Sequence, residues 1–419
     1  MAIVVHTLAL AATVLALAWL GLLLHGAVRR QARLAQLHEE ERALLRARLE
    51  RVNTALAPAA SQKGPAWSGW RKFRVDGKVL EAESVCSFYL APHDGRPLPP
   101  YLPGQYLTFR LGIPGQPREV TRCYSLSDSP HPDYYRVTIK RIPPPPGKPD
   151  APPGLSSSHF HDRIQVGDIL DVKAPGGAFH LDVEHHGPVI LIGGGVGVTP
   201  VLSMLNYLAG TAGSRETWFF YGVRNGREHV MKDHLRELAT QHQNIRLAVC
   251  YSDPLPEDKA EEDYQHAARV SVELFKKVLQ VNNFDFYICG PPPMMESLTR
   301  DLGEWGVPEE RIHFEAFGPA SVKKVAQATQ AAPPAGAFEI AFTRSNKRIA
   351  WSGAGSLLEF AEANGIRIDS GCRAGSCGTC ATAVREGQVH YLRKPDAEIE
   401  KGSCLTCISV PKEPLSLDA

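Results

Sequence analysis

Four cysteines near the C-terminal end of the chain have the spacing of an iron-binding loop. Cys372, Cys377 and Cys380 lie in the run SGCRAGSCGTC, and Cys407 follows in GSCLTCIS. Three thiolates from one short loop and a fourth from a later strand form the ligand set of a [2Fe–2S] cluster. Most residues around them are small, so the loop can curl closely around a cluster. These small residues are Gly371, Ala374, Gly375, Ser376 and Gly378. The spacing therefore predicts a protein that transfers single electrons.

Two alternatives concern this motif. A zinc ribbon would prefer two C-x2-C pairs, which the three-plus-one arrangement does not provide. Cys404 also precedes the last strand and is an alternative fourth ligand. The segment GSCLTCISVPKEPLSLD resembles the last strands of plant-type ferredoxins, in which the ligand follows a Leu-Thr or Leu-Ala pair. The resemblance implies Cys407 as the ligand and Cys404 as a small buried hydrophobic residue.

Length, charge and cysteine usage limit the class of protein. A chain of 419 residues has room for two to four domains. The net charge of +1 gives no concentrated basic surface, so we expect no nucleic-acid partner. Four of the nine cysteines belong to the motif, and the other five are scattered and do not form a disulfide framework, which favours a reducing compartment.

The N-terminal segment predicts a membrane anchor. From Ile3 to Leu24 the chain is almost entirely apolar, which is about the length that spans a bilayer. A cleaved signal peptide is the alternative, but no Lys or Arg precedes the run and no A-x-A-like site follows it. Arg29, Arg30 and Arg33 come directly after the span. The positive-inside rule then predicts a single-pass protein of the inner (cytoplasmic) membrane with its catalytic domains in the cytoplasm.

Changes in pattern divide the rest of the chain. Alternating apolar and polar runs such as QYLTFRL predict an antiparallel β-barrel, and the later order of strand, Gly-rich turn, helix and strand predicts an α/β domain with a parallel sheet. The multidomain organisation that we expect is a transmembrane anchor (1–26), a helical stalk and linker (27–69), a β-barrel (70–183), an α/β domain (184–320), a linker (321–335) and an α+β domain of the β-grasp type that carries the four cysteines (336–419).

Three motifs between Phe73 and Pro319 resemble the ferredoxin–NADP reductase superfamily, and especially the reductase half of flavohaemoglobins. The first motif is RCYSLS, which begins at Arg122. The resemblance implies that Arg122 pairs with a flavin phosphate, that Tyr124 packs on the isoalloxazine and that Ser125 hydrogen-bonds near its N5, with Cys123 between them. It also implies that Tyr106 touches the flavin and that Ser157 lies at a helix N-terminus that receives the phosphates. The implied cofactor is FAD, with FMN as the alternative.

The second motif, GGGVGVTP, follows an apolar strand and precedes a helix. It is similar to the nicotinamide pyrophosphate loop of the superfamily, which implies contacts from Gly194, Gly195, Val196, Gly197, Val198 and Thr199. The later run ICGPPPMM is similar to the segment beside the nicotinamide, which implies roles for Cys289 and Gly290. Arg224 and Arg227 are available for a 2′-phosphate, yet similar segments belong mostly to NADH-using relatives, so we expect NADH, with NADPH as the alternative.

The third motif, HFEAFGPA, is similar to the segment that closes the reductase half of flavohaemoglobins. The resemblance implies that Phe317 covers the flavin face where nicotinamide enters. Glu315 is either an electrostatic tuner near the flavin or a solvated residue. The residues that we expect at the reaction itself are Ser125, Cys289 and Phe317.

These expectations combine into a reductase that passes electrons from NADH to FAD, then to a [2Fe–2S] cluster, then to an acceptor protein. The acceptor that we expect is a membrane-bound, Rieske or diiron enzyme such as an oxygenase, hydroxylase or desaturase. The alternative is an electron-input subunit of a membrane respiratory or quinone-linked complex. Sodium-pumping quinone reductases have a similar subunit with the opposite domain order, which favours the first interpretation.

Overall fold

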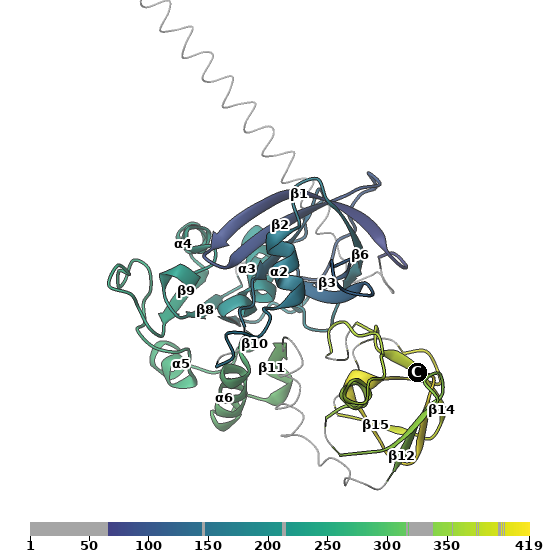
Figure 1. Ribbon diagram of the computed structural model, residues 1–419. Coiled ribbons are helices and arrows are strands. Elements are labelled where there is room, and N and C mark those ends of the chain that lie inside the picture. Colours follow the sequence, from purple (N-terminus) through teal and green to yellow (C-terminus); the bar gives the residue numbers. More distant parts are fainter. Residues whose placement is uncertain are drawn as a thin grey trace, which may run out of the picture. The chain divides into compact units, whose positions relative to one another are not determined.

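Figure 1 shows the computed structural model of the chain. It describes residues 66–144, 147–211, 215–315, 317, 338–353, 355–373, 375, 377–392, 395, 397 and 399–419. The chain divides into two compact units, Met1–Ala57 and Pro58–Ala419, and all described residues belong to the second. The predicted membrane span, helical stalk and linker 321–335 lie outside the described residues. Among the helices of the described part, none is both long and apolar enough to cross a membrane.

The first domain is an antiparallel sheet of six strands in the order β4-β3-β6-β1-β2-β5. An isolated bridge between Leu126 and Val137 joins the end of β4 to β5, so the two outer strands meet and the sheet curves into a barrel. Phe160 of helix α2 fills one end and packs against the rings of Phe88, Phe109 and Tyr124. The elements are β1 (Arg71–Ala82), β2 (Val85–Pro92), β3 (Tyr106–Leu111), β4 (Val120–Ser125), β5 (Tyr135–Lys140), α2 (Leu155–Asp162) and β6 (Ile169–Gly176).

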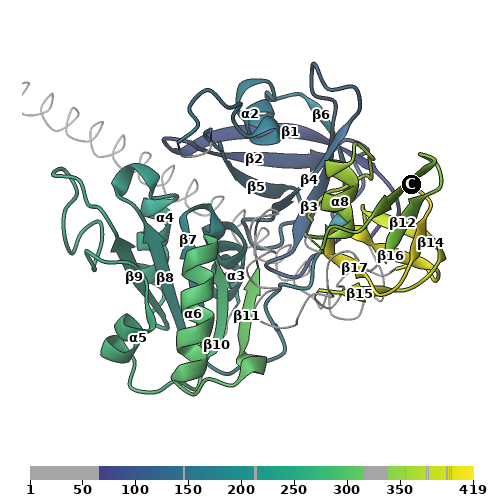
Figure 2. The same ribbon diagram turned by 60° about the horizontal axis from the view of Figure 1, so that its bottom comes forward.

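The second domain is a parallel five-stranded sheet in the order β11-β10-β7-β8-β9. Its central strands are almost wholly apolar because helices cover both faces. One face packs with α3 around Leu191 and Tyr221, and the other packs with α5 and α6 around Ile190 and Phe220; Figure 2 shows α6 in front of the sheet. The strands are β7 (Val189–Gly194), β8 (Thr217–Val223), β9 (Ile245–Tyr251), β10 (Asp285–Cys289) and β11 (Ile312–Glu315). The helices are η2 (Gly195–Gly197), α3 (Val198–Gly210), η3 (Gly226–Glu228), α4 (Lys232–Gln241), α5 (Val272–Val278), α6 (Pro292–Glu304) and η4 (Glu309–Arg311).

The third domain has a mixed sheet in the order β13-β12-β18-β14-β16, with β12 and β18 parallel, and a separate pair β15-β17. Helix α8 begins at a capping box in which Ser356 and Glu359 each bond the other's backbone N–H. Its apolar side meets Trp351, whose ring centroid lies 5.0 Å from that of Phe360. The elements are β12 (Glu339–Phe342), β13 (Lys347–Ala350), α8 (Leu357–Ala363), β14 (Ala381–Glu386), β15 (Val389–Tyr391), β16 (Ser403–Leu405), η5 (Thr406–Ile408), β17 (Ser409–Pro411) and β18 (Leu415–Leu417).

The predicted succession of an antiparallel sheet domain and a parallel-sheet domain is confirmed. The exact domain boundaries and the β-grasp assignment of the third domain stay predictions.

Candidate active site

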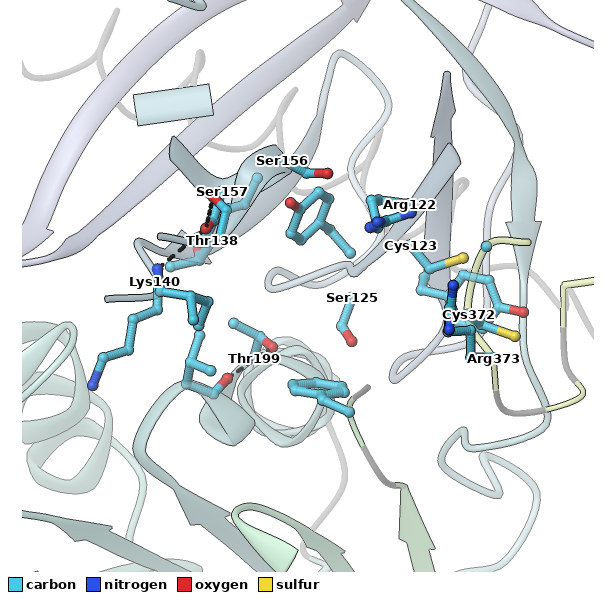
Figure 3. A pocket seen from close by; sticks show the side chains of 18 of the residues that line it. Arg122, Cys123, Ser125, Thr138, Lys140, Ser156, Ser157, Thr199, Cys372 and Arg373 are labelled. Atoms are coloured by element: carbon cyan, nitrogen blue, oxygen red, sulfur yellow. Dashed lines mark hydrogen bonds between the residues drawn. The ribbon is translucent and has the colours of Figure 1, made fainter. Parts of the chain in front are cut away.

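A cavity of about 600 Å³ is lined by residues from all three domains. Strands β4 and β5 and helix α2 provide one side, the loop before α3 and the segment after β11 provide another, and the cysteine loop provides the third (Figure 3). The lining residues are Tyr106, Arg122, Cys123, Tyr124, Ser125, Thr138, Ile139, Lys140, Ile142, Gly154, Leu155, Ser156, Ser157, Val196, Thr199, Glu315, Phe317, Gly371, Cys372 and Arg373.

Strand β4 brings the first motif to the cavity. Tyr106 of β3 lies directly opposite Ser125 of β4, and each of the two residues is only 5% exposed. Gly177 has φ +114°, and a Cβ at that position would lie 2.8 Å from the Tyr106 ring, so glycine leaves the room that the ring needs. Tyr106, Tyr124 and Ser125 are thus held rigidly at the cavity wall, which suits the binding of a planar ring system.

Arg122 supplies positive charge to the same wall. Its Nη1 donates a hydrogen bond of 2.7 Å to the Thr121 carbonyl oxygen, so the guanidinium is held in place. Burial, and then the nearby Arg373 guanidinium, lower the pKa of Arg122. Two cations that repel each other at one cavity wall are suited to an anionic ligand such as a flavin phosphate. Arg373 was missed at the sequence level, because only the folded chain brings the cysteine loop to Arg122.

The N-terminus of α2 differs in detail from the prediction. The Ser157 hydroxyl lines the cavity but is engaged locally: it donates to the Gly154 carbonyl oxygen (3.0 Å) and accepts from the Ile142 N–H (3.1 Å). Ser156 Oγ is also buried, and the Tyr124 hydroxyl lies beside it. A buried hydroxyl at a helix N-terminus fits a bound phosphate. The run LSSSH offers three serines, and their sequence alone does not say which one faces the cavity.

The second motif forms a close turn between β7 and α3. A Cβ on Gly197 would lie 2.4 Å from the Cys289 carbonyl oxygen, so the turn approaches β10 as closely as backbone allows. Gly195 has φ +53° and open space where a Cβ would be, which leaves room for a ligand along the turn. Of the predicted residues here, Val196 and Thr199 line the cavity, whereas Gly194, Gly195, Gly197 and Val198 are not among its lining residues.

Cys289 does not face the cavity. Its side chain is fully buried in the core beneath α3, and burial, followed by the charge of Glu315, raises the pKa of the thiol well above its usual value. The thiol is therefore neutral and not a reactive nucleophile. Gly290 is likewise not among the residues that line the cavity. The Gly197 turn packs closely on both residues, and their predicted place beside the nicotinamide stays a prediction.

The third motif reaches the cavity with two side chains. Glu315 ends β11 and lines the cavity, and Phe317 lines it as well and remains 38% exposed. A large aromatic side chain that is half exposed at a cavity mouth has room to move. This placement fits an aromatic that covers the ring system until the second substrate enters.

Arg224 and Arg227 follow β8, at the carboxyl edge of the parallel sheet where dinucleotides bind. Arg224 pairs with Asp253 at 3.0 Å, and Arg227 pairs with Glu257 at 3.1 Å. Both arginines are therefore already neutralised by carboxylates from the segment after β9. This arrangement disfavours the 2′-phosphate of NADPH.

The four predicted cluster cysteines come together as two pairs. The backbone N–H groups of Cys372 and Cys377 each donate to the other's sulfur, at 3.2 and 3.3 Å. The sulfurs of Cys380 and Cys407 lie 3.1 Å apart. Two pairs of thiolates suit a cluster whose two irons share four ligands.

Cys404 lies elsewhere in the same domain. It is fully buried in the core that contains Ile340 and Trp351, whereas Cys407 packs with Cys372 and Cys380. Burial raises the pKa of the Cys404 thiol to about 12, so this thiol stays neutral. The loop also depends on Gly375, whose φ is +81° and whose Cβ would lie 2.4 Å from Ile408. The donor set therefore fits a [2Fe–2S] cluster held by Cys372, Cys377, Cys380 and Cys407.

Strand β4 also contacts the cysteine loop. Cys123 shares a side-chain hydrogen bond with Cys377 and lies 3.3 Å from Thr108 Oγ1. A Cβ on Gly371 would lie 3.3 Å from the Thr121 methyl group. One short strand thus touches both the cavity and the cluster ligands.

Comparisons with known proteins identify each domain. Residues 75–181 match the family model of the oxidoreductase FAD-binding domain, residues 191–300 that of the oxidoreductase NAD-binding domain, and residues 342–412 that of the 2Fe-2S iron-sulfur cluster binding domain. The flavohemoprotein of Chromobacterium violaceum is 38% identical over 285 residues, which are 68% of this chain and 70% of that protein. The chain belongs to the flavohemoprotein family of oxidoreductases.

The flavohemoprotein of Halalkalibacterium halodurans is 40% identical over 269 residues, which are 64% of this chain and 65% of that protein, so the chain spans about two thirds of its length. Phthalate dioxygenase reductase, described as a modular structure for electron transfer from pyridine nucleotides to [2Fe-2S], is similar over 84% of this chain and 98% of its own, with 26% identity and a TM-score of 0.52. The predicted enzyme class and cofactor domains are confirmed: the chain carries the FAD-binding, NAD-binding and [2Fe–2S] domains of an NAD(P)H-dependent oxidoreductase.

Proposed function

We propose that the protein is a membrane-anchored reductase that delivers electrons from NADH, one at a time, to an oxygenase, hydroxylase or desaturase. The observation that carries this proposal is the cavity that Tyr124, Thr199 and Cys372 line together, because these residues come from the flavin, nicotinamide and cluster domains. FAD accepts two electrons as hydride and can pass them singly to an iron–sulfur cluster, which couples the two cofactor domains.

The residues of the chain divide this work. Arg122 and Ser156, with the N-terminus of α2, would hold the phosphates of the flavin, while Tyr106 and Tyr124 would border the site of its ring system. The Gly197 turn and Thr199 hold the nicotinamide nucleotide, and Phe317 covers the ring site until it arrives. Cys123 joins the wall of the cavity to the cluster ligand Cys377. No proton transfer by a side chain is required, so the protein acts by positioning.

The proposal for electron flow is tested with the holoprotein under anaerobic conditions. One equivalent of NADH should bleach the flavin absorbance and then produce the electron paramagnetic resonance signal of a reduced [2Fe–2S] cluster, at a rate at least equal to turnover with cytochrome c. If cytochrome c is reduced at the full rate while no cluster signal forms during turnover, the proposal is wrong.

The acceptor class is supported by the similarity to phthalate dioxygenase reductase. Mixing the protein with a Rieske oxygenase component or a diiron hydroxylase component should give NADH consumption that matches substrate hydroxylation. If neither component is supported and a soluble quinone is reduced instead, the acceptor class is wrong.

The location of the protein is supported by the apolar run Ile3–Leu24 and the arginines that follow it. The full chain should remain in the membrane fraction after an alkaline carbonate wash. A chain that lacks residues 1–56 should be soluble, coloured and active with ferricyanide. If that shortened chain still sediments with membranes, the predicted span is not the anchor.

A further inference from the structure

A buried polar network connects the flavin barrel to the nicotinamide domain at a distance from the cavity. It is centred on Asp128, which follows the flavin motif on the connection between β4 and β5. Its hydrogen bonds reach helix α3, which begins at the nicotinamide loop. The members of the network are Tyr101, Asp128, Tyr134 and Arg136 of the barrel and Ser203, Asn206 and His234 of the nicotinamide domain.

The barrel fixes Asp128 from several sides. Its carboxylate accepts a hydrogen bond from the Tyr134 hydroxyl at 3.1 Å and pairs with Arg136 at 3.4 Å. Its carbonyl oxygen accepts from the Tyr101 hydroxyl at 2.6 Å. The side chains of Arg136 and Asp128 are only 7% and 15% exposed, so this ion pair is largely shielded from water. Asp128 therefore has one well-defined position, three residues after the cavity residue Ser125.

Helix α3 meets Asp128 with two side chains. The Ser203 hydroxyl donates to the Asp128 carbonyl oxygen at 2.5 Å, and Asn206 Nδ2 donates to the carboxylate at 2.8 Å. His234 Nε2 lies 2.8 Å from Asn206 Oδ1. The imidazole donates this hydrogen bond, because an amide oxygen can only accept. The amide of Asn206 is thus held from both ends, between the barrel and helix α4.

The same face of α3 carries the cavity residue and the network. Thr199, Ser203 and Asn206 follow one another at intervals of four and three residues, which places them on one side of the helix. Thr199 lines the cavity, and the other two bind Asp128. Gly104 of the barrel approaches the same helix, since a Cβ there would lie 2.6 Å from the Met204 methyl group.

We propose that Asp128 and Asn206 are positioning residues for hydride transfer, because they fix the distance between the strand that carries Ser125 and the helix that carries Thr199. Directional hydrogen bonds to a buried charge resist both shear and separation more strongly than apolar packing does. Hydride transfer requires the reacting atoms to be near contact, and a displacement of about 1 Å far from the chemistry costs up to about a hundredfold in rate.

The main test uses Asn206→Asp, which keeps the size of the side chain and places a second carboxylate against Asp128. The rate of flavin reduction at saturating NADH should fall at least about tenfold, while bound FAD and the dissociation constant for NADH change less than about twofold. The long-wavelength charge-transfer absorbance of the reduced protein with NAD⁺ should weaken, because it reports the stacking of the two rings. Amide hydrogen exchange in the ligand-free protein should speed up at residues 198–210.

A matched control and two further variants complete the test. Asn282→Asp makes the same chemical change in the nicotinamide domain, where Asn282 bonds the Trp305 carbonyl oxygen and no barrel residue; it should leave the reduction rate and the charge-transfer band unchanged. Ser203→Ala removes one bond only and should give a smaller loss in the same two readouts if Asn206→Asp does not fold. Combining Asp128→Asn with Asn206→Asp restores a carboxylate–amide pair and should recover part of the lost rate.

The proposal is overturned if Asn206→Asp and Ser203→Ala lower only the melting temperature and leave the reduction rate and charge-transfer band at the wild-type values. It is equally overturned if the effects of Asp128→Asn and Asn206→Asp simply multiply, because independent sites would not share one positioning function.

Discussion

At the scale of single residues, Cys404 and Cys407 have different surroundings although only two residues separate them. Cys407 lies 3.1 Å from Cys380, sulfur to sulfur, whereas Cys404 is enclosed by the apolar core of its domain. We predict that Cys407→Ser abolishes the visible absorption of the cluster and that Cys404→Ser leaves it. The flavin content should be unchanged in both variants, since Arg122, Tyr124 and Ser125 lie on another domain. The reverse pattern would assign the fourth thiolate to Cys404.

Two carboxylates are predicted to set the choice between NADH and NADPH. Asp253 and Glu257 pair with Arg224 and Arg227, the two arginines that the sequence offers for a 2′-phosphate. Exposed pairs of this kind are worth up to about 1 kcal/mol each, so releasing both arginines should raise kcat/KM for NADPH about tenfold. The measurement compares kcat/KM for NADH and for NADPH in the double variant that combines Asp253→Asn and Glu257→Gln. Glu273→Gln, which releases the exposed Lys276 on α5, serves as the control and should change neither value. An unchanged preference in the double variant would remove these residues from nucleotide selection.

At the scale of elements, the turn between β7 and α3 is the part least able to change. Gly197→Ala would bring a Cβ to 2.4 Å from the Cys289 carbonyl oxygen, and a backbone atom cannot move aside as a flexible side chain can. The turn should shift, so the dissociation constant for NADH should rise about tenfold or more while FAD stays bound. Stopped-flow titration with NADH measures this constant.

Gly303→Ala on α6 is the matched control, because nothing lies within 4 Å of its Cβ. Alanine is the better helix former there, so this variant should bind NADH normally and be slightly more stable. Normal NADH binding by Gly197→Ala would mean that the turn has more freedom than its contacts indicate.

The same elements show what sequence patterns can and cannot predict. Apolar periodicity and turn residues suffice to predict the antiparallel and the parallel sheet, because both patterns follow from which strand faces are buried. Arg122, Tyr124 and Thr199 were expected at the cofactors from the resemblance of their motifs to a known superfamily, and the structure brings the three to one cavity. Side-chain direction is not contained in the motifs: Ser157 is engaged by the backbone, and the Cys289 thiol faces the core.

Contacts between domains also cannot be predicted from these sequence patterns. Arg373 beside Arg122, and Asp128 beside Asn206, depend on how separately folded segments meet. The periodicity and spacing of one segment do not indicate which other segment it will contact. Only the folded chain identifies these residues.

At the scale of the whole molecule, we predict that two functions can be separated: NADH oxidation at the flavin and the release of single electrons through the cluster domain. Except for the part of the cysteine loop that includes Arg373, the residues of the flavin and nicotinamide site lie between Tyr106 and Phe317, and the cluster residues lie on a domain of their own after residue 338. Arg122→Ala should lose bound flavin, and with it every NADH-dependent activity, because the flavin phosphate loses its charge-assisted partner. Loss of the third domain should instead remove only the one-electron exit.

The most direct measurement compares the full chain with a chain that ends at residue 319, using NADH with two acceptors. Ferricyanide takes electrons from flavin directly, so both proteins should reduce it at similar rates for each bound FAD. Cytochrome c or the native acceptor requires the cluster, so the shortened chain should fail with it although its flavin is fully reduced by NADH. If the shortened chain reduced the native acceptor as fast as the full chain, the third domain would serve docking alone and the electron relay would be contradicted.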